Sequence, residues 1–463
     1  MRLTIWGAAQ QVTGSMHLLQ LDNYNILIDC GLDYEKGTWV EDNEQFPFLP
    51  ADIDVVILTH AHIDHSGNLP TLVRMGFEGQ ILCTSPTADL TELLLLDSVN
   101  IFLSKQRKTR KGKRGNSSGP KPLYLQKHVM ETVDRFVTIG FNKTFQLNGQ
   151  ANLTFIPVGH LLGAAAAVLR ITENGVEKSI AFSGDIGRKN YPVLTDPEFL
   201  PDVDYLVCES TYGGRLHNSS KTIEEVLTET VNEACVKSPG RLIIPAFSIG
   251  RTQALVYSLN KIFSKGLLPR IKVFVDSPMA GFATEIFRKH HHLLNEDAKE
   301  FYNREGDEFE FDNLDYVHDM KESKAISDYY EPCIIISSAG MLEGGRIQDH
   351  LYNNIQNYYC TILFIGYCAK NTLGHRLLRG DPIVHIRDTE LSVYATIKKT
   401  DQLSGHADHN DLVNFVKQQS IDKLKRVFLV HGETASMLDL QVALIAEKYN
   451  VEIAEKGLTY ELD

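Results

Sequence analysis

Four residues with metal-binding side chains lie close together in the stretch His60-Ala61-His62-Ile63-Asp64-His65. They follow an apolar run at 54–59 that is predicted to form a buried strand. In an extended segment residues i and i+2 point the same way, so His60 and His62 can approach one ion together. Asp64 and His65 follow where we expect a helix to begin, and they face a different position. A lone histidine is usually a core or surface residue, but this density of ligands indicates a metal site.

The ligand types favour zinc, because histidine and carboxylate occur here without cysteine; manganese or iron are weaker alternatives. Four clustered ligands do not complete two sites, so further ligands are expected at other strand ends. Three candidates directly follow apolar runs at 155–158, 180–183 and 428–430: His160, Asp185 and His431. Because α/β folds gather active sites at the ends of strands, we expect these residues to join the cluster.

Short, β-branched apolar runs recur along the chain and are separated by amphipathic segments such as 223–236 and 252–264. The clearest of these runs lie at 54–59, 205–208, 241–245, 272–275, 332–336, 361–365 and 426–430. Nearly continuous apolar strands of this kind are buried on both faces, so helices must cover the sheets. The sequence therefore predicts an α/β protein.

Length and composition describe a globular protein of two to three domains. The 463 residues are 43% hydrophobic and 23% charged, which excludes global disorder. No apolar run approaches the roughly 18 residues that span a bilayer, and Gln10 and Gln11 interrupt the N-terminus before a signal-peptide core. Seven scattered cysteines without a CxxC pair argue against a disulfide framework. We therefore expect a cytoplasmic protein with buried cysteines and no membrane partner.

Charge is distributed unevenly along the chain. Lys and Arg number 46 against 59 Asp and Glu, a formal net charge of −13, which by itself argues against a polyanionic partner. The segment 105–122 is the exception, because seven of its first ten residues are basic and a Gly/Ser/Pro-rich tail follows. Its composition predicts an exposed, mobile loop, either simply solvated or acting as an electrostatic arm for nucleic acid.

Longer motifs carry a family resemblance. The HAHIDH stretch, the later Gly-His and Gly-Asp motifs and Asp29 in ILIDCG resemble the signature of metallo-β-lactamase-fold hydrolases. The motifs ESTYG (209–213), SGHAD (404–408) and VHGE (430–433) resemble those of the β-CASP group, the nucleic-acid-processing branch. This resemblance implies a metallo-β-lactamase αββα sandwich, residues 1–212 and 397–463, with an inserted α/β β-CASP domain at 213–396.

The resemblance also implies a site with two Zn²⁺ ions, for which Mn²⁺ is a substitute. Three groups of ligands follow from it: His60, His62 and His160 for one ion, Asp64, His65 and His431 for the other, and Asp185 as the bridge. Asp29 would orient the ligands, which is a general need of metal-bound histidines. Two ions about 3.5–4 Å apart can hold a hydroxide and neutralise charge on a phosphodiester, which agrees with the RNA hydrolysis that the resemblance implies.

Glu209 and His406 are implied to face each other beside the metals. A carboxylate partner stabilises an imidazolium, so His406 could contact the scissile phosphate or protonate the leaving oxygen. Asp408 and His409 are interpreted as residues at a helix N-terminus. The run 290–292, three histidines on a predicted helix, is interpreted as surface.

Glycine- and serine-rich turns after predicted strands suggest how the substrate is held. Such turns expose backbone N–H groups that favour anions, although tight packing turns are the alternative explanation. We expect contacts to the RNA backbone from six residues: Ser248, Arg251, Ser337, Ser338, Gly340 and Arg376. In TLGHRL, His375 stands where relatives would have arginine, which leaves that contact to Arg376.

The sequence thus predicts a zinc-dependent ribonuclease that acts on single-stranded RNA in processing or decay. A DNA-processing relative is the nearest alternative, but in that branch the last-motif histidine is typically replaced, so His431 favours RNA. A catalytically silent RNA-binding scaffold is disfavoured because all the implied metal positions, Glu209 and His406 are filled. The sequence does not decide whether the enzyme cuts as an endonuclease or an exonuclease, or whether it forms a homodimer.

Overall fold

The structure, a computed structural model, describes residues 1–33, 43–112, 122–217 and 221–463. These residues divide into two compact units. The first contains Met1–Lys189, Asp196–Leu216 and His406–Asp463, and the second contains Asn190–Thr195 and His217–Gly405. The domain limits given above from the sequence stay a prediction.

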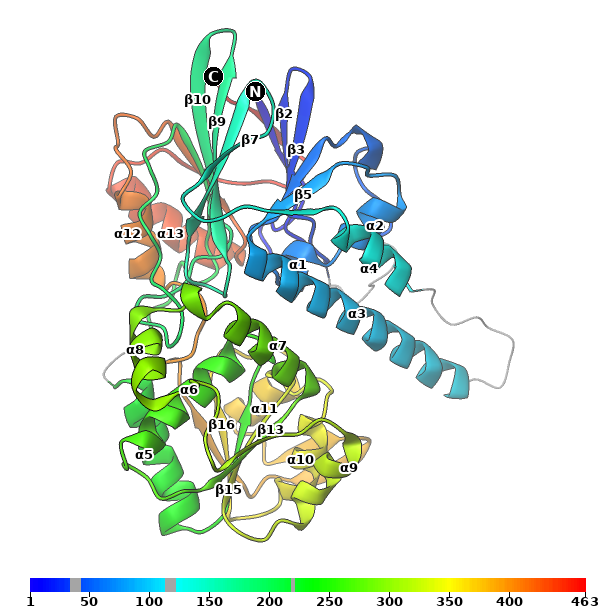
Figure 1. Ribbon diagram of the computed structural model, residues 1–463, viewed down its shortest axis with the longest axis vertical. Coiled ribbons are helices and arrows are strands. Elements are labelled where there is room, and N and C mark those ends of the chain that lie inside the picture. The colour runs from blue at the N-terminus through cyan, green and yellow to red at the C-terminus, as the bar shows by residue number, and fades with distance from the viewer. Residues whose placement is uncertain (34–42, 113–121, 218–220) are drawn as a thin grey trace. The chain divides into compact units, whose positions relative to one another are not determined.

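The first unit is built on two seven-stranded sheets (Figure 1). In spatial order the first sheet contains β22 (Thr459–Glu461), β1 (Arg2–Ile5), β2 (His17–Leu21), β3 (Tyr24–Ile28), β4 (Val55–Ile57), β5 (Gln80–Cys83) and β6 (Phe136–Thr138). The second contains β21 (Val451–Ile453), β20 (Arg426–Val430), β11 (Tyr205–Glu209), β10 (Val176–Phe182), β9 (Ala165–Glu173), β8 (Ala151–Pro157) and β7 (Thr144–Gln146).

Alternating side chains of these strands serve two different cores. Ile26 and Ile28 of β3 join a cluster that also contains Phe155 and Phe428 of the second sheet, so this face packs between the sheets. Leu27, between them, packs with Leu72 in a separate cluster on the outer face. The strands are therefore buried on both faces, as their continuous apolar runs predict.

Helices cover the outer faces of both sheets of the first unit (Figure 1). The first sheet is flanked by α1 (Ile63–Ser66), α2 (Leu69–Arg74), α3 (Ser85–Gly112) and α4 (Gln126–Val133), and the second by α12 (His409–Lys417) and α13 (Thr434–Ala446). This is the expected αββα sandwich.

The second unit contains a six-stranded sheet whose strand pairs are all parallel. Its order is β14 (Leu314–Tyr316), β13 (Lys272–Asp276), β15 (Cys333–Ser337), β12 (Arg241–Pro245), β16 (Cys360–Phe364) and β19 (Thr396–Lys399), beside a hairpin of β17 (Ile383–Ile386) and β18 (Thr389–Ser392). Leu242, Ile243 and Ile244 of β12 are all fully buried, so helices shield both faces of this sheet too.

The helices of the second unit are α5 (Ile223–Val231), α6 (Arg251–Ser264), α7 (Pro278–Lys289), α8 (Glu296–Glu305), α9 (Met320–Ala325), α10 (Ile347–Asn354) and α11 (Leu373–Arg379). A π-helical segment, Asn232–Lys237, continues α5. The helices predicted at 223–236 and 252–264 and the central strands are confirmed to within a few residues. Both units combine sheets with covering helices, which is the predicted α/β class, although hairpins connect several strands of the first unit.

The prediction of a loop for the basic segment 105–122 is wrong over its first part. Residues 105–112 continue α3, which runs without interruption from Ser85 to Gly112. Lysine and arginine are good helix formers, and no proline or glycine precedes Gly112 in this stretch, so the charge run alone does not end the helix. Residues 113–121 lie outside the described residues.

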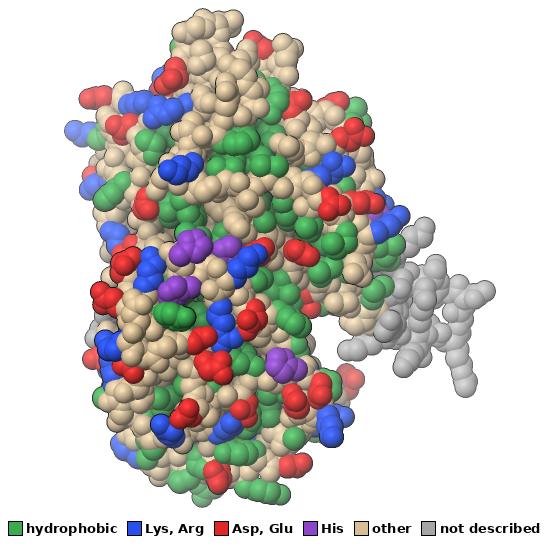
Figure 2. All heavy atoms as spheres, in the orientation of Figure 1, with side chains coloured by type: hydrophobic (Ala, Val, Ile, Leu, Met, Phe, Trp, Pro, Cys, Tyr) green, Lys and Arg blue, Asp and Glu red, His purple; other side chains and the backbone are tan. Residues whose placement is uncertain are grey.

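Three expectations from composition can be checked directly. All seven cysteines are buried and unpaired, as predicted. Across the described ranges, no helix is both long and apolar enough to cross a bilayer. On the face shown in Figure 2, acidic and basic side chains are interspersed over each unit, so the net charge of −13 does not form one acidic surface there.

Candidate metal and catalytic centre

The loop that carries the HAHIDH stretch is fixed by Asp29, at the end of β3. Its carboxylate accepts hydrogen bonds from the Thr59 N–H at 2.8 Å and the Thr59 hydroxyl at 2.9 Å. It also lies 2.6 Å from Nδ1 of His65. Because a carboxylate can only accept, this contact places the proton on Nδ1 and leaves Nε2 of His65 as a metal-binding lone pair.

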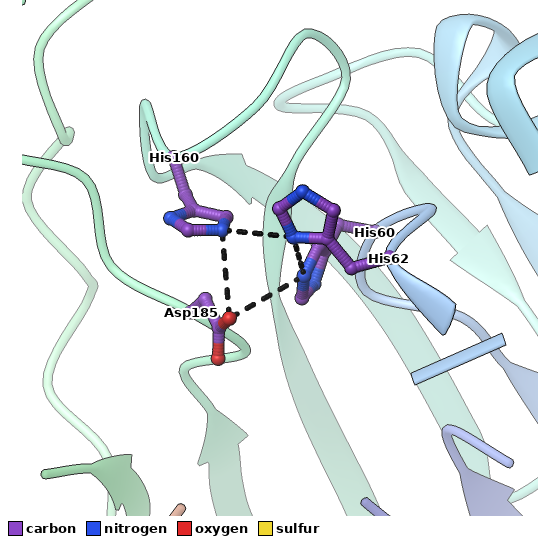
Figure 3. Close-up of side chains that lie close together, drawn as sticks. All are labelled: His60, His62, His160 and Asp185. Atoms are coloured by element: carbon purple, nitrogen blue, oxygen red, sulfur yellow. Dashed lines mark hydrogen bonds and ion pairs between the residues drawn. The ribbon is translucent and has the colours of Figure 1, made fainter. Parts of the chain in front are cut away.

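Three histidines and Asp185 form a first group of ligand atoms, which point toward one another in Figure 3. Nδ1 of His62 is 3.1 Å from Nε2 of His60 and 3.1 Å from Nε2 of His160. Oδ2 of Asp185 is 3.5 Å from both of those Nε2 atoms. Zinc bonds of about 2.0–2.1 Å at tetrahedral angles separate neighbouring ligands by about 3.3 Å. The spacing therefore fits one tetrahedral ion.

A second group consists of Asp64, His65 and His431. Nε2 of His431 is 3.3 Å from Nε2 of His65 and 3.6 Å from Oδ2 of Asp64. Oδ1 of Asp185 is 3.3 Å from Nε2 of His65, and it lies 3.4 Å from Nδ1 of His431, which is not the ring nitrogen that faces Asp64. These separations also match neighbouring zinc ligands.

Asp185 thus presents one carboxylate oxygen to each group. Its side chain is 2% exposed, and Oδ1 has no hydrogen-bond partner among the described residues. A buried carboxylate oxygen without a donor is costly unless a cation compensates it. The residues present therefore fit divalent cations, and Asp185 faces both groups of ligand atoms.

Close backbone packing holds the ligand loops in register. A Cβ atom at Gly31 would lie 1.6 Å from the carbonyl oxygen of Asp64, and one at Gly187 would lie 2.6 Å from the backbone nitrogen of His160. Neither position can carry a larger side chain unless the loop beside it moves. Glycine here serves close approach of two backbone segments.

The protonation states follow from burial and from the neighbouring charges. Burial lowers the pKa of His60 well below its ordinary value. Burial alone would raise the pKa of Asp64, but the hydrogen bond and charge of His431 and the charge of His65 lower it to about 2. The pKa of His65 is raised because the carboxylates around it, Asp185 first, outweigh its burial. The group therefore concentrates negative charge, which a divalent cation can balance in place of protons.

Glu209 and His406 meet beside the metal ligands. Glu209 ends β11 and is fully buried, and its Oε1 lies 3.2 Å from Nδ1 of His406. The same oxygen accepts the Ile186 N–H at 2.6 Å, which fixes the carboxylate. The His406 ring lies 4.5 Å from the ring of His160, and its side chain is 18% exposed. The pair is therefore a carboxylate-oriented histidine at the edge of the metal group.

Two of the serines predicted to contact substrate converge in the second unit, at the carboxyl ends of its strands. The Ser248 and Ser338 hydroxyls lie 3.0 and 3.2 Å from the hydroxyl of Ser277. Ser277 was missed by sequence reasoning, although a serine before Pro278 is typical of a helix N-cap, which it forms for α7. Ser337 instead donates to the backbone oxygen of Asp276 at 3.0 Å.

The remaining predicted contacts have partners within the second unit. The Arg251 guanidinium lies 4.7 Å from the centre of the Phe247 ring. Gly340 also lies next to Phe247, because a Cβ atom added at Gly340 would be 3.5 Å from the Phe247 ring. Arg376 pairs with Asp381 at 3.1 Å near the end of α11, and Asp381 also pairs with Arg379 at 2.8 Å.

His17 is a further residue near the site that sequence reasoning missed. It is 4% exposed, its Nδ1 has no partner among the described residues, and it lines a small cavity with Asp29, His65 and His431. Burial, with the nearby charges of His65 and His431, lowers the pKa of His17 to about 3. A single histidine inside a strand carries no sequence signal that distinguishes it from a core residue.

Two interpretations of other polar residues have different outcomes. Asp408 caps α12, because its side chain accepts the Asp411 N–H at 3.0 Å, as predicted. The interpretation of 290–292 as surface is wrong for His290, which is 5% exposed. The helix α7 ends at Lys289, and the chain turns at His290 into a short 3₁₀ segment, which buries that side chain.

Comparison with known families divides the chain into three matched segments. Residues 10–232 match the metallo-beta-lactamase superfamily, and residues 252–377 match the Beta-Casp domain. Residues 390–454 match the Zn-dependent metallo-hydrolase RNA specificity domain. The first and last matches contain every residue of the two ligand groups.

Comparison with individual proteins covers the chain almost end to end. It is 30% identical over 459 residues to "Ribonuclease TTHA0252" of Thermus thermophilus, 99% of each chain. It is 30% identical to "Transcription termination factor FttA" of Methanothermobacter thermautotrophicus, over 97% of this chain and 70% of that one. A crystal structure of a protein of unknown function from Enterococcus faecalis has the same fold at 13% identity, with a TM-score of 0.57 over 100% and 99% of the two chains.

Proposed function

Because the chain belongs to the β-CASP family of the metallo-β-lactamase superfamily, we propose that it is a zinc-dependent ribonuclease acting on single-stranded RNA. The observation that carries this proposal is the position of Asp185, whose two oxygens face two separate groups of metal-ligand atoms. The match to an RNA specificity domain and the similarity to a named ribonuclease support RNA as the substrate.

Seven residues would hold two zinc ions, or manganese in their place: His60, His62, Asp64, His65, His160, Asp185 and His431. Bound there, the ions supply Lewis acidity and lower the pKa of a coordinated water to near ~7. Asp29 keeps His65 oriented, and Asp64 has its pKa lowered to about 2 by His431 and His65, so its carboxylate is ionised at neutral pH.

His406 is the residue assigned to contact with the phosphate or to proton transfer. Glu209 accepts from Nδ1 of His406, so the other ring nitrogen, Nε2, is left to contact the scissile phosphate or to protonate the leaving oxygen. The backbone N–H of Ile186 holds Glu209 in place, which keeps the imidazole orientation fixed through the reaction.

The second unit supplies contacts to the RNA backbone. Ser248 and Ser338, with Ser277 between them, form a hydroxyl cluster next to the N-termini of α6 and α7. Hydroxyls and helix N-termini favour phosphate oxygens. Arg251, Ser337, Gly340 and Arg376 remain predicted contacts, of which Arg376 has the least support because Asp381 already pairs with it.

The direct test compares labelled single-stranded RNA with DNA of the same sequence, using zinc-loaded protein. RNA cleavage should be abolished by Asp64→Ala and slowed at least about 10²-fold by His406→Ala. It should persist in His385→Ala, which changes a histidine that is 60% exposed in the second unit. Cleavage that survives both active-site substitutions, or DNA cut as readily as RNA, would contradict the assignment. Product lengths over time separate endonuclease from exonuclease action.

Three finer statements belong to the same proposal. The enzyme would act in the cytoplasm, in RNA processing or decay, and would bind two zinc ions per chain. Light scattering on the purified protein tests whether it forms a homodimer. Metal analysis of freshly purified protein should give about two zinc ions per chain, and one ion or none would refute the two-metal part.

A further inference from the structure

A cavity of about 370 Å³ opens at the amino-terminal edge of the parallel sheet in the second unit. Its walls come from three segments that precede strands: 239–241 at β12, 327–331 before β15, and 353–359 before β16. It therefore lies at the opposite edge of this sheet from Ser248 and Ser338. Ligand pockets commonly measure about 300–1,000 Å³, so the cavity can accept a small organic ligand.

Two tyrosines with unusually exposed side chains border this cavity. Tyr330 is 95% exposed and Tyr359 is 65% exposed, and they come from different segments of its wall. A third tyrosine, Tyr329, packs its ring edge-to-face on Phe274 at 5.3 Å. An exposed aromatic ring lacks the stabilisation that burial gives to other aromatic side chains. Its free face is a surface on which a nucleobase can stack.

Arg241 brings a positive charge to the same wall. Its guanidinium donates to the backbone oxygens of Ser327 at 3.0 Å and Tyr329 at 2.5 Å, and to Oδ1 of Asn354 at 3.4 Å. All three acceptors are neutral, and no carboxylate in the described part of the chain lies within ion-pair distance of Arg241. The guanidinium is thus held in position with its charge unbalanced, which suits an anionic ligand.

The remaining lining is rich in amides and poor in aliphatic side chains. Asn353, Asn354 and Asn357 all border the cavity, and Pro239 is the one lining residue that is apolar and bulky without being aromatic. Asn354 is 4% exposed and donates to the His350 backbone oxygen at 2.8 Å, so its position is fixed. Protein interfaces have apolar cores, whereas amides with aromatic faces and arginine are the groups that read nucleotides.

We propose that this cavity binds one nucleotide, with its base stacked on Tyr330 or Tyr359 and its phosphate facing Arg241. The one acidic lining residue, Glu331, lies 3.3 Å from the Tyr329 hydroxyl, so the phosphate is expected on the Arg241 side. The inference that this nucleotide belongs to an RNA strand rests on the proposed function. The inference that the cavity binds a nucleotide does not depend on it. In an RNA substrate the site would hold one nucleotide of the strand.

The first experiment titrates zinc-loaded protein with adenosine 5′-monophosphate and with adenosine, using isothermal calorimetry. The monophosphate should bind more tightly than adenosine, and the difference should shrink as salt is raised, because Arg241 contributes through charge. Equal affinities for the two ligands would refute the role of Arg241. This comparison needs no substitution of Arg241, whose hydrogen bonds also hold the wall of the cavity together. No saturable binding of the monophosphate would refute the site.

The second experiment assigns that binding to the tyrosines. Tyr330→Ala and Tyr359→Ala together should raise the Kd for the monophosphate at least about fivefold, as expected for loss of base stacking. Tyr302→Ala is the matched control, since Tyr302 is 47% exposed on α8 and does not line the cavity. An unchanged Kd in the double variant would overturn the proposal, even if the monophosphate binds elsewhere on the protein.

The third experiment identifies the source of the nucleotide. In an Asp64→Ala background, which prevents cleavage, a hexameric oligoadenylate should bind more weakly once Tyr330 and Tyr359 are also replaced by alanine. If only the free monophosphate responds to the tyrosine substitutions, the site binds a free nucleotide and its assignment to RNA is wrong. Both results are independent of whether the intact enzyme cleaves RNA, so failure of this proposal is distinguishable from failure of the proposed function.

Discussion

Asp29 and His65 are joined by a 2.6 Å contact between a carboxylate oxygen and Nδ1 of the imidazole. The same carboxylate binds the N–H and hydroxyl of Thr59, the residue that precedes the ligand loop. One buried side chain thus fixes both the start of the loop and the orientation of one ligand within it. Asp29 itself adopts a left-handed backbone with φ of 58°, which aspartate tolerates better than most residues.

Asp29→Asn should weaken metal binding without unfolding the first unit. The amide keeps the shape of the side chain, but it has no negative charge and only one acceptor oxygen. It therefore cannot accept all the hydrogen bonds that Thr59 and His65 donate to the carboxylate. Loss of such a supporting hydrogen bond typically costs about 10–100-fold in metal affinity. Competition with a chromogenic zinc chelator measures this, with Asp52→Asn, an exposed aspartate, as the control. Unchanged zinc affinity in Asp29→Asn would contradict the role given to the carboxylate.

His406→Ala and Glu209→Gln should slow catalysis while leaving the zinc content unchanged. General acid–base groups contribute about 10²–10⁴-fold to rate, and Glu209 acts only through His406, so its substitution should cost less. Single-turnover cleavage of a labelled RNA, measured beside zinc analysis of the same samples, separates rate from metal loss. Because Asp185 also lies close to this pair, loss of zinc in either variant would mean that the pair serves the metals instead.

Gly31→Ala should disrupt the centre although it changes no ligand. The added Cβ would lie 1.6 Å from the Asp64 carbonyl oxygen, so the ligand loop must move. Gly149→Ala is the matched control, because nothing lies within 4 Å of a Cβ there. We expect Gly31→Ala to lose zinc and to lower the melting temperature, and Gly149→Ala to do neither. A zinc-loaded, stable Gly31→Ala protein would show that the loop can adapt.

The clustering of the proposed ligands could be predicted from sequence because they follow apolar strands, where periodicity and residue type give independent signals. His60 and His62 share a face by strand geometry alone, and His160 and His431 needed only the rule that sites form at strand ends. The αββα arrangement and the inserted domain followed from the ordered motifs rather than from periodicity.

What could not be predicted depends on contacts between distant segments. Ser277 joins Ser248 and Ser338 only because three strands end side by side, and His17 reaches the site only through pairing of β2 with β3. His290 is buried because α7 ends one residue before it. The cavity at Arg241 likewise combines three segments, none of which carries a recognisable motif.

Asp276, at the end of β13, is the centre of a buried polar network in the second unit. Its carboxylate accepts from Ser323 at 2.6 Å and contacts His350 at 2.6 Å and Arg346 at 2.7 Å. Burial alone would raise the pKa of Asp276, but the hydrogen bonds from His350, Ser323 and Arg346 outweigh it and lower the pKa below the ordinary value. The network therefore depends on the ionised carboxylate.

Asp276→Asn should lower the free energy of local unfolding around β13 by about 3 kcal/mol at pH 7, because it leaves Arg346 without its buried partner. The pKa of Asp276 is lower in the folded protein than its unfolded value of about 3.9. Its carboxylate therefore stabilises the folded state fully above about pH 3.9, and this contribution is lost as the pH falls through the folded pKa. The difference between wild type and variant should therefore be constant from pH 7 to about pH 5 and shrink in more acidic solution. Hydrogen exchange of β13 peptides measures it, with Asp312→Asn, an exposed ion-pair partner of Arg270, as the control. A difference that grows on acidification would refute this account of the network.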